Sequence, residues 1–245
     1  MSETSPSVRS YVQSQAFFAA SLVAVLALAV VMMAFIDIPV ARFFEEYGRS
    51  RPSWLKSLSD GARHYGQAFS ALLAFLTMLS LDPRRRKQAI LMAVAVIAAA
   101  LITNVFKLTT GRARPRMFLQ EGQMWSAFKG FSTSAYAALP SAHTASAFAL
   151  SGALSRNYPR GAWVFLAAAA LCGASRVFDN VHYISDVFLG GLLGLWLGYG
   201  VYRWRWSISL ADSIEKSVWR LRPDPEGGRD AGSGSREDDS IPDEK

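Results

Sequence analysis

Residues 16–36 read AFFAASLVAVLALAVVMMAFI, a run of 21 residues without a charged side chain. A helix needs about 20 predominantly apolar residues to cross the hydrocarbon core of a bilayer. The run is too long for the hydrophobic region of a signal peptide, Arg9 is the only basic residue before it, and it lacks a clear small-residue cleavage site. We therefore interpret it as a membrane helix that the mature protein retains.

Five more apolar runs follow along the chain. A buried globular core could explain any one of them, but six runs separated by loops indicate a polytopic membrane protein. We therefore expect an all-α fold, a bundle of six transmembrane helices with its functional site at the membrane interface. The expected helices cover residues 16–37, 65–81, 87–107, 142–155, 161–176 and 184–204.

The charge distribution divides the chain into four segments. We expect an N-terminal cytoplasmic segment at 1–15, the six-helix transmembrane domain at 16–206 and a basic juxtamembrane segment at 207–222. Residues 223–245 carry eight acidic and three basic residues among Pro, Gly and Ser, which predicts a disordered acidic tail. The basic residues of the remaining chain flank the predicted spans, so anionic lipid is a simpler partner for them than nucleic acid.

Two long stretches between the predicted helices, 38–64 and 111–140, combine aromatic with charged residues. We interpret both as non-helical segments lying in the membrane interface. Counting the connections places both on one face of the bundle. The ends of four predicted helices open onto the same face, so polar residues far apart in the sequence should converge there.

The opposite face carries the short loop Arg84-Arg85-Arg86-Lys87 together with both chain termini. Short cytoplasmic loops of membrane proteins are enriched in Lys and Arg. This predicts that both termini are cytoplasmic and that the polar residues converge on the extracytoplasmic side.

The last polar cluster contains His182 and Asp186, which are four residues apart. At helical spacing, the carboxylate of Asp186 can accept a proton from one imidazole nitrogen and leave the other nitrogen with a free lone pair. A histidine held in this way can act as a nucleophile. The simpler interpretation is an ordinary acidic residue in a first helical turn beside an incidental interfacial histidine.

A second cluster, Ser141-Ala142-His143, follows Pro140 at the start of a predicted helix. Ser141 is an ordinary N-cap residue. The free N–H groups of a first helical turn also attract anions, so a phosphate bound there would lie beside His143, a candidate general acid.

Four cations, Lys107, Arg112, Arg114 and Arg116, lie just past the end of a predicted helix, and Arg176 joins them from another helix. Such residues are often a belt of long side chains reaching the membrane surface. Here they lie on the face that the orientation predicts to be poor in cations. Because the arginine fork matches two phosphate oxygens at once, a phosphate site is the alternative that we favour.

Three other features have structural interpretations. His64 lacks such polar neighbours and is expected to be solvated or interfacial. Cys172 lies in an apolar run as a small packing residue. Gly190, Gly194 and Gly198 form a small-xxx-small ridge, which predicts close helix packing beside His182 and Asp186.

Three motifs together resemble the signatures of type 2 phosphatidic acid phosphatases: Lys107-x6-Arg114-Pro115, then Pro140-Ser141-Ala142-His143, then Ser175-Arg176-x5-His182-x3-Asp186. With the helices between them, the resemblance covers roughly residues 66–200. It implies a six-helix bundle, a phosphohistidine mechanism without metal and an extracytoplasmic active site. The family is also similar to vanadium haloperoxidases, whose vanadate pocket mimics a pentavalent phosphoryl transition state.

The resemblance assigns a role to each matching residue. His182 would be the nucleophile, Asp186 its orienting partner and His143 the general acid. The phosphate would be held by Lys107, Arg114, Ser141, Ala142 and Arg176. The family usually has Gly where this chain has Ala142, and Ala would strain a loop that needed a positive φ there.

We therefore expect a metal-independent phosphatase of membrane lipid phosphates or diphosphates, with no cofactor and no nucleic-acid partner, in a bacterial inner membrane. Two alternatives remain: a lipid phosphotransferase using the same intermediate, and a non-catalytic carrier of phosphate lipids. A metal site built from the two histidines and the carboxylate is disfavoured, because Lys107, Arg114 and Arg176 would repel a dication.

Overall fold

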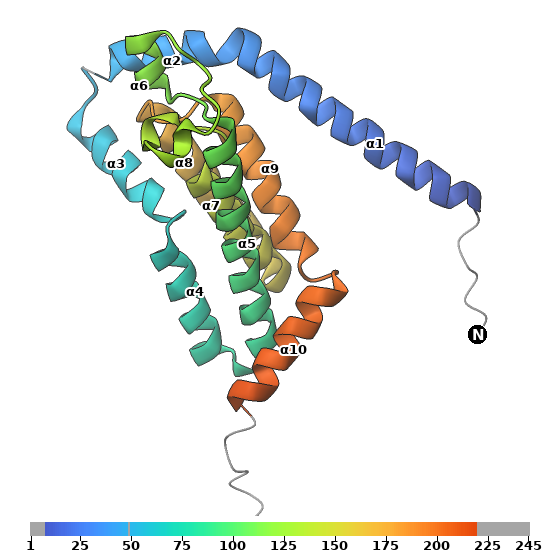
Figure 1. Ribbon diagram of the computed structural model, residues 1–245. Coiled ribbons are helices and arrows are strands. Elements are labelled where there is room, and N and C mark those ends of the chain that lie inside the picture. Colours follow the sequence, from blue (N-terminus) through green and yellow to red (C-terminus); the bar gives the residue numbers. More distant parts are fainter. Residues whose placement is uncertain (1–7, 49, 220–245) are drawn as a thin grey trace, which may run out of the picture.

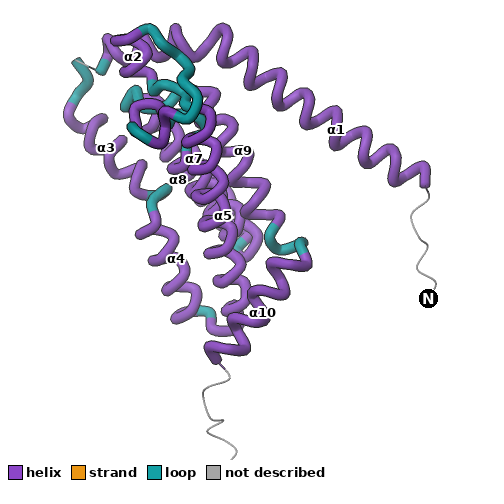
Figure 2. The backbone as a smooth tube through the Cα atoms, viewed as in Figure 1, coloured by secondary structure: helices purple, strands orange, loops and turns teal. Residues whose placement is uncertain are grey.

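A computed structural model describes residues 8–48 and 50–219 of the 245-residue chain. Within these residues the fold is helical and has no β-strand; one isolated bridge pairs Arg112 with Trp125 (Figures 1 and 2). The α-helices are α1 (Val8–Val31), α2 (Asp37–Tyr47), α3 (Ser53–His64), α4 (Ala68–Leu81), α5 (Arg86–Thr110), α6 (Pro115–Glu121), α7 (Ala142–Asn157), α8 (Ala162–Phe178), α9 (Ile184–Gly200) and α10 (Arg205–Trp219).

Helix α7 lies at the centre of the bundle, where it packs against α5, α8 and α9 (Figure 1). Its buried positions are mostly small, among them Ala145, Ala149 and Gly152. Small side chains let neighbouring helix backbones approach closely, which membrane helices require because lipid tails are as apolar as their side chains. The Ala-rich sequence of α7 therefore suits an interior position.

Glycines of α9 face this central helix. A Cβ at Gly190 would lie 2.6 Å from the carbonyl oxygen of Ser141, and one at Gly198 would lie 2.6 Å from that of Ala149. At Gly194 a Cβ would overlap the carbonyl oxygen of Ala145. The predicted glycine ridge is confirmed, and it fixes the separation of α7 and α9.

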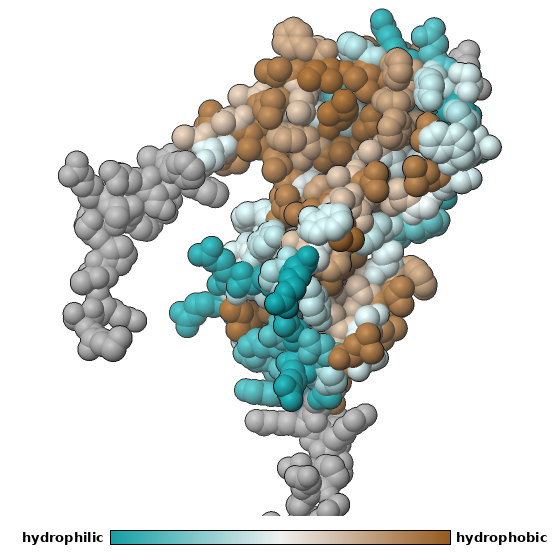
Figure 3. Space-filling view, turned by 180° about the vertical axis from the view of Figure 1, so that it is seen from behind, coloured by the Kyte–Doolittle hydropathy of each residue, from teal (hydrophilic) through white to brown (hydrophobic). Residues whose placement is uncertain are grey.

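Three helical segments are long and apolar enough to cross a membrane: Ala19–Tyr47, Pro83–Thr110 and Pro159–Phe178. Helices α9 and α10 together would be a fourth, bent by 63°. Apolar side chains dominate the upper and middle parts of the face in Figure 3, and hydrophilic ones gather at its lower end. The predicted all-α membrane fold is confirmed, with the count of six spanning helices approximate.

Helix α1 differs from the other predicted spans in its position. It leaves the upper end of the bundle and runs away from it (Figure 1), and only 6% of its most apolar window is buried. A π-helical turn, Met32–Ile36, joins it to α2. The π-turn and α2 bring Asp37 to the end of the bundle where the loops between the helices gather.

The expectation that two long stretches are non-helical was wrong for 38–64 and partly wrong for 111–140. Residues 38–64 are largely helical, as α2 and α3, and residues 111–140 contain α6 and two short 3₁₀ turns. In 38–64, the aromatic and charged residues that suggested an irregular segment lie on amphipathic helices, which bury one face against the bundle. The predicted juxtamembrane segment is helical as far as Trp219, within α10, and the predicted acidic tail lies outside the described residues.

The cationic loop predicted at the opposite end is part of the packing there. Lys87 pairs with Asp212 of α10 at 2.5 Å, and Arg85 pairs with Asp82 at 2.8 Å. Arg85 also donates to the carbonyl oxygen of Asn157 at the end of α7. These contacts tie α4, α5, α7 and α10 together at the end of the bundle remote from the histidines.

Candidate active site

Helix ends bring the predicted site residues together. Gly111, with φ of +59°, ends α5 in a left-handed cap, so Lys107 lies in its last turn. His143 lies in the first turn of α7, and Arg176 lies in the last turn of α8. His143 interacts electrostatically with Arg176, His182 and Lys107, so motifs separated by up to 75 positions meet at one site.

His182 lies in the loop between α8 and α9 and is 3% exposed. Its Nδ1 lies 2.8 Å from the carbonyl oxygen of Ala138 and 3.6 Å from Asp186 Oδ2. Because a carbonyl oxygen can only accept, Nδ1 carries the proton and a neutral ring has its lone pair on Nε2. Burial lowers the pKa of His182 to about 4, although Asp186 acts in the opposite direction. The ring is therefore neutral at physiological pH.

Asp186 has a different main partner from the one expected. Its Oδ1 accepts a hydrogen bond from Arg112 Nη1 at 2.5 Å, and its Oδ2 accepts one from the backbone N–H of Tyr183 at 2.9 Å. The distance from Asp186 Oδ2 to His182 Nδ1, 3.6 Å, is longer than either of these hydrogen bonds. We expected one imidazole nitrogen to donate to Asp186; in the structure, Nδ1 donates to the Ala138 carbonyl, so the carboxylate acts on the ring through its charge.

The first turn of α7 is joined to this group through its backbone. The N–H of Ser141 donates to the carbonyl oxygen of Asp186 at 3.0 Å, and the hydroxyl of Thr144 donates to Ser141 Oγ at 2.9 Å. Ser141 is fully buried, and its own hydroxyl proton remains to be donated. Ala142 has no positive φ, so alanine is not strained at the position where the family usually has glycine.

The remaining cations near the histidines are only partly compensated, with Arg176 Nη1 3.5 Å from Asp179 Oδ2. Lys107 interacts electrostatically with Arg114 and Arg176 as well as with Asp186. The Nε atoms of Arg114 and Arg176 are buried and have no hydrogen-bond partner within the described part of the chain. Burial and the charge of Arg176 lower the pKa of Arg114. Buried donors without partners are costly, and an anion bound among them would supply acceptors.

Arg63, in the last turn of α3, is a further cation of the site that the sequence interpretation missed. It interacts electrostatically with His143 and with Arg176, and its Nε is also buried without a partner in the described residues. It was overlooked because residues 38–64 were interpreted as an irregular interface segment. An amphipathic pattern over 53–64 could have indicated the helix.

Two members of the cation cluster, Arg112 and Arg116, have contacts within the protein. Arg112 is 1% exposed and bonds to Asp37, Ser185 and Asp186. Arg116 is exposed and donates to the carbonyl oxygen of Asp179 at 2.7 Å. Arg112 and Arg116, to which the family resemblance assigned no role, are therefore held by protein groups.

Comparison with known proteins identifies the family of this chain. Residues 88–209 match the family model described as PAP2 superfamily. The chain belongs to the PAP2 superfamily. The PAP2 segment holds Lys107, Arg114, Arg176 and the residues of the two histidine motifs, whereas Asp37 and Arg63 lie outside it.

Curated PAP2 relatives resemble part of the chain. A lipid A 1-phosphatase of Rhizobium johnstonii is 35% identical over 102 residues, which cover 41% of this chain and 41% of that protein. Lipid phosphate phosphatase 1 of Arabidopsis thaliana is 33% identical over 136 residues, covering 44% and 42%. The matches thus span about two fifths of the length of these relatives.

Two solved structures share the PAP2 fold. LpxE of Aquifex aeolicus superimposes with a TM-score of 0.53 and 19% identity over 69% of this chain and 96% of that chain. The first transmembrane PAP2-type phosphatidylglycerolphosphate phosphatase from Bacillus subtilis gives a TM-score of 0.52 and 19% identity over 83% and 98%. At this identity the likeness establishes the fold.

Proposed function

We propose that this PAP2 protein is a lipid phosphate or diphosphate phosphatase that works through a phosphohistidine on His182. The observation that carries the proposal is the buried, neutral His182, whose Nδ1 is held by the Ala138 carbonyl and whose Nε2 is free to attack. Around it, Lys107, Arg114 and Arg176 supply positive charge without enough acceptors.

The reaction has two steps. In the first, Nε2 of His182 forms a bond to phosphorus while the bond from phosphorus to the leaving oxygen breaks. His143, which takes up a proton from solvent when the phosphate dianion binds beside it, protonates that oxygen. In the second, His143 takes a proton from water, the resulting hydroxide bonds to phosphorus, and the bond to His182 breaks. Inorganic phosphate leaves, and both imidazoles return to their starting forms.

The cations provide the largest part of the expected acceleration. Uncatalysed hydrolysis of phosphate monoesters is among the slowest known reactions, so charge on the transferring phosphoryl group must be strongly stabilised. Guanidinium groups already placed in a water-poor site stabilise that charge without reorganising during the reaction. Arg114 and Arg176, with unpartnered buried Nε atoms, are placed for this role.

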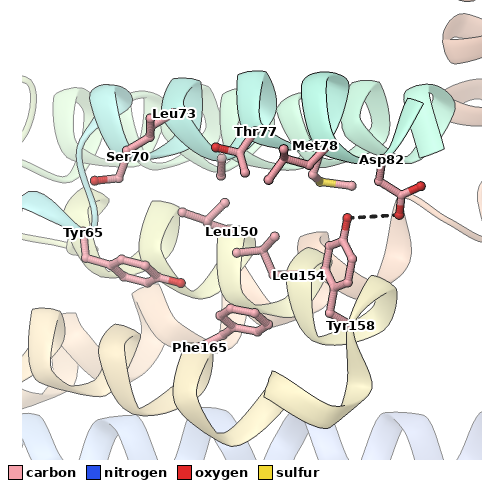
Figure 4. A pocket seen from close by; sticks show the side chains of 12 residues that line it. Tyr65, Ser70, Leu73, Thr77, Met78, Asp82, Leu150, Leu154, Tyr158 and Phe165 are labelled. Carbon is pink, nitrogen blue, oxygen red and sulfur yellow. Dashed lines mark hydrogen bonds between the residues drawn. The ribbon is translucent and has the colours of Figure 1, made fainter. Parts of the chain in front are cut away.

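An apolar groove within the bundle supports a lipid substrate. A cavity of about 680 Å³ lies between α4, α7 and α8, lined by apolar residues along its length and by Tyr65 and Tyr158 near its two ends (Figure 4). Leu150 and Leu154 follow His143 by seven and eleven residues, which places all three on one stripe of α7. A chain attached to a phosphate at His143 could therefore extend along the groove.

We infer that the site faces the extracytoplasmic side and that both termini are cytoplasmic. The support is the compact group of cations at residues 84–87, which lies at the end of the bundle remote from the histidines. Short, cation-rich loops stay in the cytoplasm. The exposed Trp125, Phe128 and Phe131 at the other end suit the lipid headgroup region.

The experiment that tests the function is phosphate release by the purified full-length protein from a panel of lipid phosphates. The panel contains lipid A 1-phosphate, phosphatidate, phosphatidylglycerol phosphate and undecaprenyl diphosphate, with glycerol phosphate as the soluble control. We expect kcat/KM for at least one lipid to exceed that for glycerol phosphate by about tenfold or more. Equal efficiency on all of them would contradict the lipid assignment.

The same assay separates the alternatives. A phosphotransferase would release little inorganic phosphate until an acceptor lipid was added, and a carrier would bind the lipids without releasing any. Activity should persist in excess EDTA and be inhibited by orthovanadate.

Filling the groove with Thr77→Trp should lower kcat/KM for long-chain substrates more than for glycerol phosphate, whereas Leu101→Trp, on the exposed face of α5, should leave their ratio unchanged.

A further inference from the structure

A buried ion network lies directly behind the catalytic pair and extends into the first membrane helix segment. Arg112 Nη2 donates to Asp37 Oδ2 at 2.7 Å, and Nη1 donates both to Asp186 Oδ1 at 2.5 Å and to Ser185 Oγ at 2.8 Å. Asp37 and Asp186 are completely buried and Arg112 is 1% exposed. One guanidinium therefore bridges the start of α2 and the first turn of α9.

Further contacts surround the network, although Arg112 Nε has no hydrogen-bond partner within the described residues. Asp37 Oδ1 accepts the backbone N–H of Ser185 at 3.1 Å, and Asp37 Oδ2 accepts the Ser185 hydroxyl at 2.5 Å. The faces of Trp125 and Tyr183 lie 5.2 Å and 4.2 Å from the guanidinium carbon. The position and direction of the Asp186 carboxylate are thus determined by Arg112 and by the buried Asp37 and Ser185 that hold it.

The charges of the network do not cancel. One guanidinium meets two carboxylates, which leaves a net charge of −1 in a region without water contact. The carboxylates also raise the pKa of Arg112 above its ordinary value, although burial alone would lower it. Burying three charged groups is expensive, and a well-packed apolar set would be at least as stable. A role in stability alone is therefore a poor explanation of the network.

We propose that Arg112 and Asp37 are positioning residues of this enzyme, which hold Asp186 beside His182 and preserve its negative charge during phosphoryl transfer. The inference rests on the proposed function, because it assigns both residues to the His182 reaction. Arg112 fixes the carboxylate through its rigid fork. Asp37 shares the guanidinium, so that Asp186 is not fully neutralised and can stabilise the positive charge that develops on His182.

Substitutions of Arg112 and Asp37 should disturb the network in different ways. Lysine at position 112 would keep the positive charge but could not reach both carboxylates in the same planar geometry. Asparagine at position 37 would keep the shape but leave Arg112 to neutralise Asp186. Neither change touches Lys107, Arg114 or Arg176, so substrate binding should survive both.

The test is steady-state kinetics of Asp37→Asn and Arg112→Lys on the best lipid phosphate, expressed per folded molecule. We expect kcat to fall by about tenfold or more, equivalent to ~1.4 kcal/mol of transition-state stabilisation, with KM within about threefold of the wild-type value. Asp212→Asn, which removes a carboxylate paired with Lys87 at the other end of the bundle, is the matched control. It should retain the wild-type kcat.

The kinetics of either variant, once shown to be folded, test the positioning role. Wild-type kcat per folded molecule, or a rise in KM alone, would overturn the inference. A second measurement does not need activity: the chain has three histidines, so ¹⁵N-histidine NMR in micelles resolves them individually. Asp37→Asn should move the ring signals of His182 and leave those of His64 in place. Unchanged His182 signals would reject the positioning role, whereas an inactive wild type with shifted signals would reject only the proposed function.

Discussion

Gly190 of α9 lies against the carbonyl oxygen of Ser141, which would be 2.6 Å from a Cβ on the glycine. On the same stretch of chain, Ser141 N donates to the carbonyl oxygen of Asp186 at 3.0 Å. The glycine therefore sets the distance between the helix that carries His143 and the loop that carries His182. Close packing in the membrane bundle determines the geometry of the reacting groups.

Gly190→Ala should separate the two histidines and lower both activity and stability. Because the obstacle is a backbone carbonyl, the helices must move apart, and overpacking of this kind costs roughly 1–3 kcal/mol. Gly61→Ala is the matched control, since nothing lies within 4 Å of a Cβ there. Thermal denaturation and kcat measured on both proteins check the prediction, and equal behaviour of the two variants would contradict it.

Replacing the two histidines should affect different parts of the first chemical step. His182→Ala should lower turnover on the order of 10³-fold or more and abolish the phosphoenzyme, because no nucleophile remains. His143→Ala should still form it, more slowly by roughly 10²–10⁴-fold for an alkyl phosphate. With p-nitrophenyl phosphate, whose leaving group needs no proton, the His143→Ala defect in phosphoenzyme formation should shrink. Rapid acid quench with labelled substrate measures phosphoenzyme formation and phosphate release in both variants. Near-wild-type phosphate release by His182→Ala would refute the mechanism.

His182 should titrate far below an ordinary histidine. Burial lowers its pKa from 6.5 to about 4, so the ring should stay neutral in the free protein until the pH approaches 4. Histidine ring shifts followed by ¹⁵N NMR in micelles measure the midpoint directly. A midpoint near 6.5 would show that the ring is solvated and that Nδ1 is not held as described.

The lowered pKa of His182 also makes the stability of the fold depend on pH. The unfolded chain binds the His182 proton near pH 6.5, whereas the folded chain binds it only near pH 4. The contribution of neutral His182 is therefore fully present above pH 6.5 and is lost as the pH falls toward 4. The free energy of unfolding of a His182→Gln variant should vary less across this window than that of the wild type.

The orientation can be tested by cysteine labelling in a Cys172→Ala background. Ser132 lies exposed at the end of the bundle that holds the histidines, and Arg84 lies exposed at the other end. In intact cells or spheroplasts, an impermeant thiol reagent should label Ser132→Cys and miss Arg84→Cys and Ser240→Cys. The reverse pattern would place the site in the cytoplasm.

Local sequence features were sufficient for most of the helices and for the membrane setting. Long uncharged runs such as 16–36 can satisfy their backbone groups in lipid only as helices, so hydropathy alone determines that they are helical. Gly111 ends α5 and the glycine row of α9 packs on α7, and both effects depend on the absence of a Cβ at those positions. The sequence was less informative over 38–64, because amphipathic helices on the bundle surface have weaker apolar patterns than membrane spans.

The polar clusters at helix ends could likewise be recognised from the sequence, because alternating helices return to the same end of a bundle. The contacts between individual side chains could not be recognised from the sequence. Arg112 and Arg114 are two residues apart and carry the same charge, yet the first is buried between two carboxylates while the second faces the histidines. Asp37 could have been singled out as a lone acid directly after an apolar run. Its partner is 75 positions away, and only the folding of α2 across the end of the bundle brings the two together.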